Sequence, residues 1–391
     1  MGNDKKMRYL IWLQQVFGYA SVTAVKVLEH FKTAENVYNA DISELKACGL
    51  LNKSQLDKIS KTDILVAEEI LEDCKKFSIK TVGLGSKDYP YSLSVIDNPP
   101  LVLYYKGELP DFLNTPTICI VGPRKVSEFG KKAAYSLSFR LAKAGFNIVS
   151  GGAVGTDTYA HAGALKAGGI TALCMGCGTQ YNYCPENKPL RDSVALSGCL
   201  ISEYPPKAST SRFSFPVRNR ILAALSHGTV VIEAGIKSGA LITANHANEQ
   251  GRDVFVIPGS MHDKCYEGSN ALMRDGAKPI LDISDIFNEY IARFPDKINI
   301  ERAYNCKIIE KDESYDALYT KKNEKSSKIS NITLSKEAEI VYNNLDKQKF
   351  FPDEILNTGL APAQILSALT ELEMEFLIKA LPGGMYEKTN S

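Results

Sequence analysis

Between residues 205 and 226 the chain has four cations and no carboxylate, although it balances 46 Lys and Arg against 45 Asp and Glu overall. Because lysine and arginine displace the counterions condensed on a nucleic-acid backbone, such a local excess favours an anionic partner. A solvated charged surface explains four charges equally well, so this run alone decides nothing. The four cations are Lys207, Arg212, Arg218 and Arg220.

Glycine-rich turns follow four of the short apolar segments. Glycine lets backbone N–H groups come close to an anion, and a helix N-terminus adds about half a positive charge. One such turn is weak evidence because tight turns need glycine anyway, but four at the ends of predicted strands indicate a phosphate-binding rim. The turns comprise residues 121–125, 150–155, 233–240 and 258–260.

The sequence lacks the motifs of the common phosphate-using enzymes. It has no Gly-x-x-x-x-Gly-Lys-Ser/Thr loop and no Gly-x-Ser-x-Gly elbow, which disfavours a P-loop ATPase and a serine hydrolase. Residues 151–155 do not match the dinucleotide fingerprint, and no acidic residue closes the predicted strand near Met175. We therefore predict no catalytic residues, no cofactor and no enzyme activity.

Two clusters suggest other chemistry. Cys174 and Cys177 have the spacing of a redox or zinc pair, but no second Cys-x-x-Cys completes a tetrahedral set. Asp157 and His161, four residues apart on a predicted helix, resemble parts of a triad or metal pair. We predict structural roles instead, with no metal site: buried thiols, a helix-capping aspartate and a hydrogen-bonding histidine.

Short apolar segments alternate with helical stretches from about residue 79, which predicts an α/β fold with an extended Rossmann-like, doubly wound sheet. The segments are unbroken and apolar, as parallel strands covered on both faces are. Ligands of such sheets bind beyond the carboxyl ends of the strands, where the glycine turns fall. The predicted strands are residues 101–105, 118–121, 146–149, 171–175, 229–232 and 253–257.

The flanking segments have other patterns. Residues 1–75 predict a module of short helices, either a generic bundle or one of the sterile-alpha-motif or helix-hairpin-helix type. The α/β domain is placed at residues 76–298. Residues 299–332 are rich in Lys, Glu, Asp and Ser and predict a flexible linker. Residues 333–391 regain helical periodicity and end with Gly383-Gly384 before a last strand, the outline of a C-terminal winged helix.

The bulk composition is that of an ordinary globular protein. The 391 residues are 44% hydrophobic and 23% charged, a length that predicts two or three domains. No uncharged apolar run reaches about 18 residues, so no membrane span is expected. The apolar run behind Lys5 and Lys6 is too short for a signal peptide, and nine scattered cysteines indicate reduced thiols in the cytoplasm.

These segments together resemble the DNA-processing protein A family. The resemblance spans roughly residues 80–290, with the motifs in the family's order, and the flanking helical and winged-helix segments are similar to its accessory domains. The motifs are Gly122-x-Arg124, Ser150-Gly-x-Ala153-x-Gly-x-Asp157-x-x-Ala-His161, Tyr183-x-Pro-Glu-Asn187, Ile201-Ser-Glu-Tyr-Pro205, Phe215-Pro-x-Arg218-Asn-Arg220, Ser238-Gly239 and Glu249-Gln-Gly-Arg252.

The resemblance implies a non-enzymatic protein that binds single-stranded DNA and loads the RecA recombinase onto it, as in natural transformation. It also implies a homodimer formed through the α/β domain. By motif position it implies a DNA pocket of ten residues. They are Arg124, Gly151, Gly152, Arg212, Arg218, Asn219, Arg220, Ser238, Gly239 and Gln250.

Four positions depart from the family pattern, namely Pro123, Gly152, Cys184 and Ala240. Proline offers a phosphate no N–H and alanine offers no hydroxyl, but no departure removes a cation. We therefore expect altered pocket geometry and retained binding.

Aromatic residues near the cations suggest how bases would be held. Phe213, Phe215 and Tyr204 are candidate stacking platforms for a single strand, with core packing the better interpretation for at least one of them.

Two alternative functions stay open. One is a nucleotide phosphoribohydrolase-like enzyme, although Glu233-Ala-Gly stands where that enzyme's Pro-Gly-Gly turn belongs. The other is a winged-helix regulator with a nucleotide-sensing domain, which would need a basic recognition helix.

Overall fold

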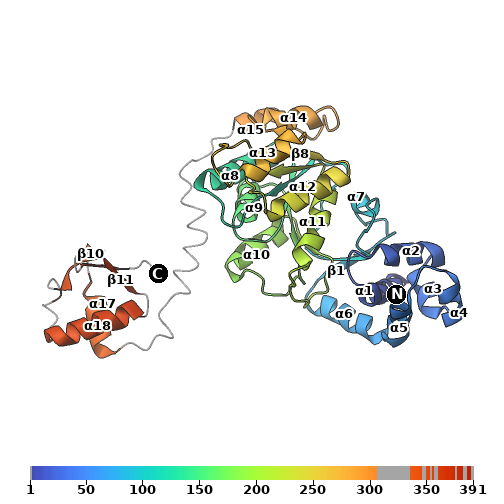
Figure 1. Cartoon of the computed structure of the whole chain (residues 1–391), viewed down its shortest axis with the longest axis horizontal. Helices are drawn as coiled ribbons and strands as arrows, with labels where there is room; N and C mark the ends of the chain where they lie inside the picture. Colours follow the sequence, from blue (N-terminus) through green and yellow to red (C-terminus); the bar gives the residue numbers. More distant parts are fainter. Residues whose placement is uncertain are drawn as a thin grey trace. The chain divides into compact units, whose positions relative to one another are not determined.

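The computed structural model divides into two compact units, Met1–Ile308 and Ile309–Ser391 (Figure 1). It describes residues 2–305, 335–345, 349–352, 355, 360–374, 377–381 and 385–388. In that part of the chain no helix is both long and apolar enough to cross a membrane.

Six helices precede the sheet, as the pattern of residues 1–75 predicts. They close around Trp12, which is 1% exposed and whose indole N–H donates a hydrogen bond to the Thr62 carbonyl at 2.8 Å. The same core includes Val102 and Tyr104 of the sheet, so the helical module and the α/β region form one unit. The helices are α1 (Gly2–Phe17), α2 (Val22–Phe31), α3 (Ala34–Asn39), α4 (Ile42–Ala47), α5 (Lys53–Lys61) and α6 (Leu65–Lys76).

A nine-stranded sheet forms the centre of the first unit, in the order β1-β2-β6-β5-β4-β3-β7-β8-β9. The seven strands from β6 to β9 in this order are parallel to one another. At one edge β2 pairs antiparallel with β6, and β1 pairs antiparallel with β2. The strands are β1 (Lys80–Gly83), β2 (Val102–Gly107), β3 (Thr117–Val121), β4 (Asn147–Ser150), β5 (Thr171–Met175), β6 (Cys199–Ser202), β7 (Gly228–Val231), β8 (Asp253–Val256) and β9 (Lys278–Pro279).

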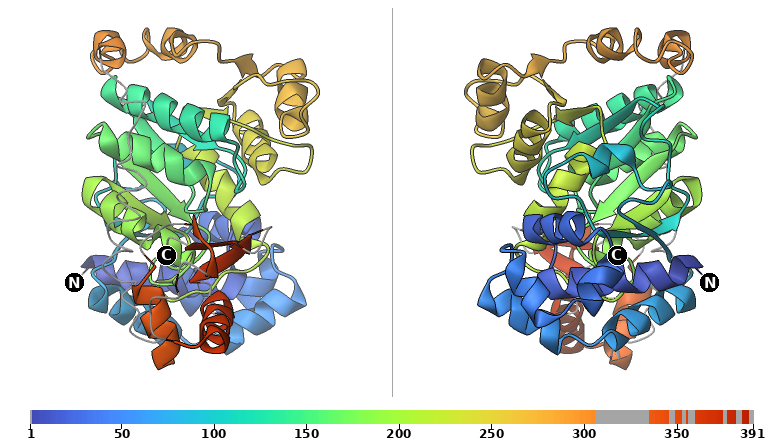
Figure 2. Two further views of the ribbon diagram at one scale, coloured as in Figure 1. Left: turned by 90° about the vertical axis from the view of Figure 1, so that its left-hand side faces the viewer. Right: turned by 90° about the vertical axis from the view of Figure 1, so that its right-hand side faces the viewer.

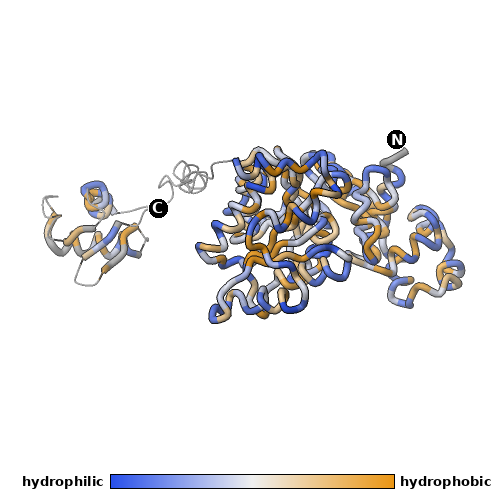
Figure 3. The backbone as a smooth tube through the Cα atoms, turned by 90° about the horizontal axis from the view of Figure 1, so that it is seen from above, coloured by the Kyte–Doolittle hydropathy of each residue, from blue (hydrophilic) through white to orange (hydrophobic). Residues whose placement is uncertain are grey.

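Helices cover both faces of the sheet, which confirms the doubly wound prediction. Successive residues of a strand point to opposite faces, so Cys174 and Met175 of β5 belong to different cores. Figure 2 (left) shows α8, α9 and α10 side by side, and Figure 3 shows the apolar strands inside the unit. One face carries α8 (Glu128–Lys143), α9 (Thr156–Lys166), α10 (Lys188–Ser197), α14 (Ser284–Tyr290) and α15 (Ile300–Tyr304). The other carries α7 (Tyr91–Ser94), α11 (Ser214–Ala224), α12 (Gly239–Glu249) and α13 (Glu267–Arg274).

Helix α15 corrects the boundary predicted at residue 298. Ala303 is completely buried in the core beneath α8, and the Asn299 N–H donates to the Ala144 carbonyl at 2.9 Å. Residues 299–305 therefore belong to the first unit and not to a linker. Residues 306–332, the rest of the predicted linker, lie outside the described residues.

The second unit has the elements of the predicted winged helix. Val341, Leu369 and Leu372 are fully buried between two helices and a three-stranded antiparallel sheet of order β10-β12-β11. The predicted turn at Gly383-Gly384 lies outside the described residues. The elements are α17 (Lys336–Asn343), α18 (Pro362–Met374), β10 (Lys349–Phe350), β11 (Ile378–Leu381) and β12 (Met385–Lys388).

Candidate nucleic-acid interface

A cavity of about 350 Å³ lies at the carboxyl edge of the sheet. From β3 the chain winds outward through β4, β5 and β6, and it then returns to β7 on the other side of β3. Ligands of open α/β sheets bind in the crevice at this reversal of strand order. The cavity walls come from the end of β3 and the turn after it (residues 121–124), the start of α9, residues 215–222 of α11 and the first half of α12.

The structure brings half of the ten predicted residues to this cavity. Arg124, Arg218, Asn219, Ser238 and Gly239 line it. Gly151 lies directly behind Arg218, because a Cβ atom at position 151 would be 2.7 Å from its Nη2.

Two guanidinium groups share one aromatic ring in the cavity. The Cζ atom of Arg124 is 5.4 Å from the centre of the Phe215 ring, and that of Arg218 is 6.0 Å from it. Arg218 is only 6% exposed and donates hydrogen bonds to the Cys174 carbonyl and, from Nε at 3.2 Å, to Asn219 Oδ1. Arg124 is exposed. One arginine is thus fixed in the wall, and the other is accessible at the rim.

Asp157 adds a carboxylate to the cavity wall, which the sequence patterns did not predict. Asp157 lies in the first turn of α9, and its Oδ2 accepts a hydrogen bond at 3.2 Å from the Ala153 N–H, in the turn before that helix. Burial raises the pKa of Asp157, and the positive charge of Arg218 opposes this shift. The predicted helix-capping role is wrong, because Gly155 is the N-cap residue of α9 and no side chain caps this helix. The Asp157 carboxylate binds the turn before the helix instead and faces the ligand space.

His161 has the structural role that the sequence predicts. Its ring is fully buried, with Nε2 2.8 Å from the Gly151 carbonyl oxygen and Nδ1 2.7 Å from Thr171 Oγ1. Burial lowers the pKa of His161 to about 4, so the ring is neutral at pH 7. Neutral His161 supports the turn that carries Gly151.

Close backbone packing shapes the turn after β3. A Cβ atom on Gly122 would lie 2.4 Å from Thr156 Oγ1, and one on Gly155, whose φ is +91°, would lie 2.3 Å from the Arg124 carbonyl oxygen. The Pro123 carbonyl accepts a hydrogen bond from the Thr156 N–H at 3.2 Å. Pro123 therefore holds the turn through its carbonyl, for which its missing N–H is no handicap.

The N-terminus of α12 forms the opposite wall. Ser238 is its N-cap, and its Oγ accepts a hydrogen bond from the Ala240 N–H at 3.3 Å. Asn219 Nδ2 donates to the Gly239 carbonyl at 3.4 Å, which joins α11 to this turn. Because unpaired N–H groups and the helix dipole favour negative charge, this wall suits a phosphate.

Arg220 and Gln250 do not reach the cavity. Arg220 is 2% exposed and forms a buried ion pair with Glu203 at 2.8 Å, so it is not free to bind phosphate in this structure. Gln250 lies at the other end of α12, where its Nε2 donates to the Arg220 carbonyl at 3.2 Å.

Gly152 and Arg212 also lie outside the cavity. The Gly152 position faces the core, since a Cβ atom there would be 3.1 Å from Leu173 Cδ2. Arg212 is exposed in the loop before α11, with its Cζ 4.5 Å from the centre of the Phe213 ring. Phe213 is 63% exposed, so this pair forms a second, exposed cation and ring unit, two residues before Phe215 in the chain.

Three of the four predicted glycine turns contribute to the cavity. The fourth, residues 258–260, does not line it. Gly259 packs against the Tyr266 ring instead, since a Cβ atom there would lie 2.0 Å from that ring. Both cysteines of the predicted pair, Cys174 and Cys177, are buried. Burial raises the pKa of Cys174 to about 12 and that of Cys177 to about 11, and the described residues contain no cluster suited to a metal ion.

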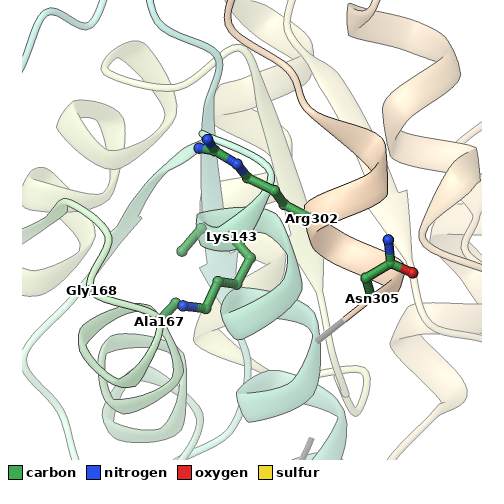
Figure 4. Close-up of a pocket in the computed structure, with 6 residues that line it drawn as sticks. Lys143, Ala167, Gly168, Arg302 and Asn305 are labelled. Atoms are coloured by element: carbon green, nitrogen blue, oxygen red, sulfur yellow. The ribbon is translucent and has the colours of Figure 1, made fainter. Parts of the chain in front are cut away.

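A second cavity, of about 550 Å³, lies where α8, α9 and α15 end (Figure 4). Its cations are Lys143 and Arg302, and none of the ten predicted residues lines it. Cations near helix C-termini offset the negative end of the helix dipole, and this effect is sufficient to explain the presence of Lys143 and Arg302 here.

Comparison with known proteins decides the family. Residues 80–291 match the model described as DNA recombination-mediator protein A, and residues 328–384 match the DprA winged helix domain. The first match alone covers more than half of the chain. The chain belongs to the DNA processing protein A family. The family resemblance found in the sequence motifs is therefore confirmed.

Relatives from several bacteria cover more than half of the chain. The DNA processing protein of Streptococcus pneumoniae is 35% identical over 295 residues, which are 73% of this chain and 99% of the relative. That of Bacillus subtilis is 40% identical over 220 residues, which are 56% of this chain and 74% of the relative.

Two solved structures of the family have the same fold. The Streptococcus pneumoniae structure has a TM-score of 0.63 at 33% identity and covers 72% of this chain and 97% of its own. The Helicobacter pylori structure, described for its single-stranded DNA binding mode, has a TM-score of 0.50 at 29% identity and covers 55% of this chain and 96% of its own. The chain thus shares the family's fold and its recombination-mediator class.

Proposed function

We propose that this recombination mediator binds single-stranded DNA at the cavity beside β3. The observation that carries the proposal is the convergence of Arg124, Arg218 and the N-terminus of α12 on one concave site. The binding mode described for the Helicobacter pylori relative supports the choice of single-stranded DNA.

Each side chain has a distinct part in this proposal. Arg124 at the rim contacts a backbone phosphate bidentately, and Arg218 adds charge from the wall. Phe215, half-buried between the arginines, offers a ring to a base. Outside the cavity, the exposed Arg212 and Phe213 pair contacts the next nucleotides of the strand. Backbone contacts and stacking predict binding without strict sequence preference.

We further propose that the protein loads RecA onto the bound strand and acts as a homodimer, as the family resemblance implies. The apolar residues of 281–290 lend little support to the dimer, because Ile286, Phe287 and Tyr290 are buried in the protein's own core. Leu281 remains 83% exposed and is the residue of that segment available to a second copy. Light scattering at micromolar concentrations tests the dimer: a 43 kDa species alone would contradict it.

The hydrolase alternative finds no support at Glu233. Its carboxylate is 1% exposed and accepts hydrogen bonds from the Ser127 N–H at 3.1 Å and the Tyr266 hydroxyl at 3.0 Å, and it does not line the cavity. We expect no release of free base or ribose 5-phosphate from nucleoside monophosphates. Turnover that is abolished by Glu233→Gln would favour the enzyme instead.

The regulator alternative lacks a basic recognition helix among the described elements of the second unit. The sequence of α18 contains Glu371 and Glu373 and neither lysine nor arginine. Helix α17 has one lysine against two glutamates. We therefore place the DNA contacts on the first unit.

The proposal is tested by competition of single-stranded against duplex DNA for the purified full-length protein. We expect preference for the single strand, and loss of binding in Arg124→Glu because an anion then stands at the cavity rim. Arg302→Glu, the same charge change on an exposed arginine of the second cavity, is the matched control and should bind normally. Normal binding by a folded Arg124→Glu protein would place the site elsewhere.

A further inference from the structure

The ion pair of Glu203 and Arg220 is buried where the helical module meets the α/β domain. Each side chain is 2% exposed, and Arg220 Nη2 lies 2.8 Å from Glu203 Oε1. Removing two charges from water costs several kcal/mol per ion unless hydrogen bonds satisfy the remaining groups. Arg220 meets this demand by donating from Nε to the Asn98 carbonyl at 3.1 Å and from Nη1 to the Val217 carbonyl at 3.0 Å.

Glu203 connects this pair to the helical module. The same Oε1 atom accepts a hydrogen bond from the Ala20 N–H at 3.2 Å, in the turn between α1 and α2. Ala20 has a φ of +54°, a left-handed conformation that a non-glycine residue adopts at a cost. The turn is therefore held in a costly shape that presents its N–H to Glu203.

Two more contacts fix the segment after Glu203 to the module. The rings of Tyr19 and Tyr204 have centres 4.2 Å apart. Lys207 Nζ lies 2.6 Å from Asp73 Oδ1 on α6. The backbone that leads from β6 to the cation-rich loop and α11 is thus tied to the helices at three places.

Arg220 connects the helical module to the cavity, because it lies on α11 next to residues that line the cavity. Arg218 and Asn219 precede it directly and line the cavity, and its own carbonyl accepts from Gln250 of α12. Since a helix moves as a rigid element, fixing Arg220 fixes the direction in which Arg218 and Asn219 point.

We propose that Glu203 and Arg220 are positioning residues through which the N-terminal helical module holds α11 in its DNA-binding orientation. The inference rests on the proposed function, because it explains how that site is kept in shape. It replaces the predicted role of Arg220 as a phosphate contact. It also gives the helical module a part in DNA binding that needs no contact between the module and DNA.

The test uses full-length Arg220→Met, Glu203→Gln and the double variant. Removing one partner leaves a buried charge or donor unpaired, whereas replacing both leaves a neutral pair of similar size. We expect single-strand affinity to fall roughly 2- to 30-fold in Arg220→Met, with recovery in the double variant. The log–log salt slope should stay at the wild-type value, because no phosphate contact is lost.

Hydrogen exchange of the free protein gives a second readout that does not depend on DNA. Amides of α11 should exchange faster in Arg220→Met than in the wild type, while those of β3 and β4 should not change. Tyr19→Leu, which removes the ring contact with Tyr204 and leaves every charge paired, should act in the same direction if Arg220→Met fails to fold.

The outcomes are separable. A salt slope flatter by about 0.7 in Arg220→Met would show a lost phosphate contact and overturn the proposal. A lower melting temperature with unchanged affinity and unchanged α11 exchange would make the pair purely structural and also overturn it. Faster α11 exchange in a protein whose wild type binds no single strand would support the coupling and contradict the proposed function alone.

Discussion

A Cβ atom on Gly151 would lie 2.7 Å from Nη2 of Arg218 and 2.4 Å from Oδ2 of Asp157. Both contacts are shorter than van der Waals separation, and both partners line the cavity. The missing side chain at position 151 therefore makes room for the guanidinium and the carboxylate to stand together.

The variant Gly151→Ala should weaken single-strand binding, because its methyl group must displace Arg218 or Asp157 from the cavity wall. Gly152→Ala is the matched control, since Gly152 lies outside the cavity and a Cβ atom there would meet only the Leu173 side chain, at 3.1 Å. Fluorescence anisotropy with a labelled oligonucleotide measures both. Equal affinities for the two variants would contradict the packing explanation.

The salt dependence of binding should report about three phosphate contacts, from Arg124, Arg218 and Arg212. At about −0.7 per contact for a single strand, the log–log slope should be roughly −2. Arg218→Ala should flatten the slope by about 0.7 and weaken binding to all sequences alike, since backbone contacts carry no base information. An unchanged slope in folded Arg218→Ala protein would exclude this arginine as a phosphate contact.

Stability should fall as the pH decreases from about 6.5 to 4. Burial lowers the pKa of both His161 and His227 to about 4, whereas an unfolded histidine titrates near 6.5. The unfolded chain therefore binds more protons in this window, and the stabilisation present above pH 6.5 is lost as the pH falls through 4. At about 1.4 kcal/mol per pKa unit, each histidine contributes roughly 3 kcal/mol. Urea unfolding at several pH values measures the effect.

The variant His161→Gln provides the control for the pH dependence. It keeps a polar side chain at the position but cannot titrate, so about half of the pH-dependent loss should disappear. A loss between pH 6.5 and 4 that is as large in His161→Gln as in the wild type would assign the effect to other groups.

A chain ending at Asn305 should fold and bind single-stranded DNA, because the first compact unit contains the whole cavity. A chain ending at Lys297 should be less stable, since it loses the buried Ile298 and Ala303 from the core beneath α8. Thermal unfolding compares the two. Loss of single-strand binding in the longer chain would move the site to the second unit.

Much of the fold follows from the sequence. Each of the six predicted strands lies within two residues of an observed strand, because unbroken apolar runs between helices have few alternatives to a covered parallel sheet. Strands β1 and β9 were not predicted, the first because polar and apolar residues mix in Lys80–Gly83 and the second because it has two residues. Strand β6, Cys199–Ser202, was seen only as part of a motif.

The sequence also predicted where the candidate site lies. Glycine turns after strands and uncompensated arginines predicted an anion-binding rim at the carboxyl edge, and β3, β4 and β7 place three of those turns around one cavity. The reason is local, because parallel strands deliver their following turns to the same edge.

Only the tertiary structure decided which residues face that cavity. Arg218 and Arg220 are two residues apart on α11, which at 3.6 residues per turn places them on nearly opposite sides of the helix. The two arginines of this motif therefore have different surroundings. Arg218 faces the ligand space, and Arg220 faces Glu203 and the helical module. Their roles depend on segments distant in the chain that pack on each side of the helix, which no local pattern of charge or glycine records.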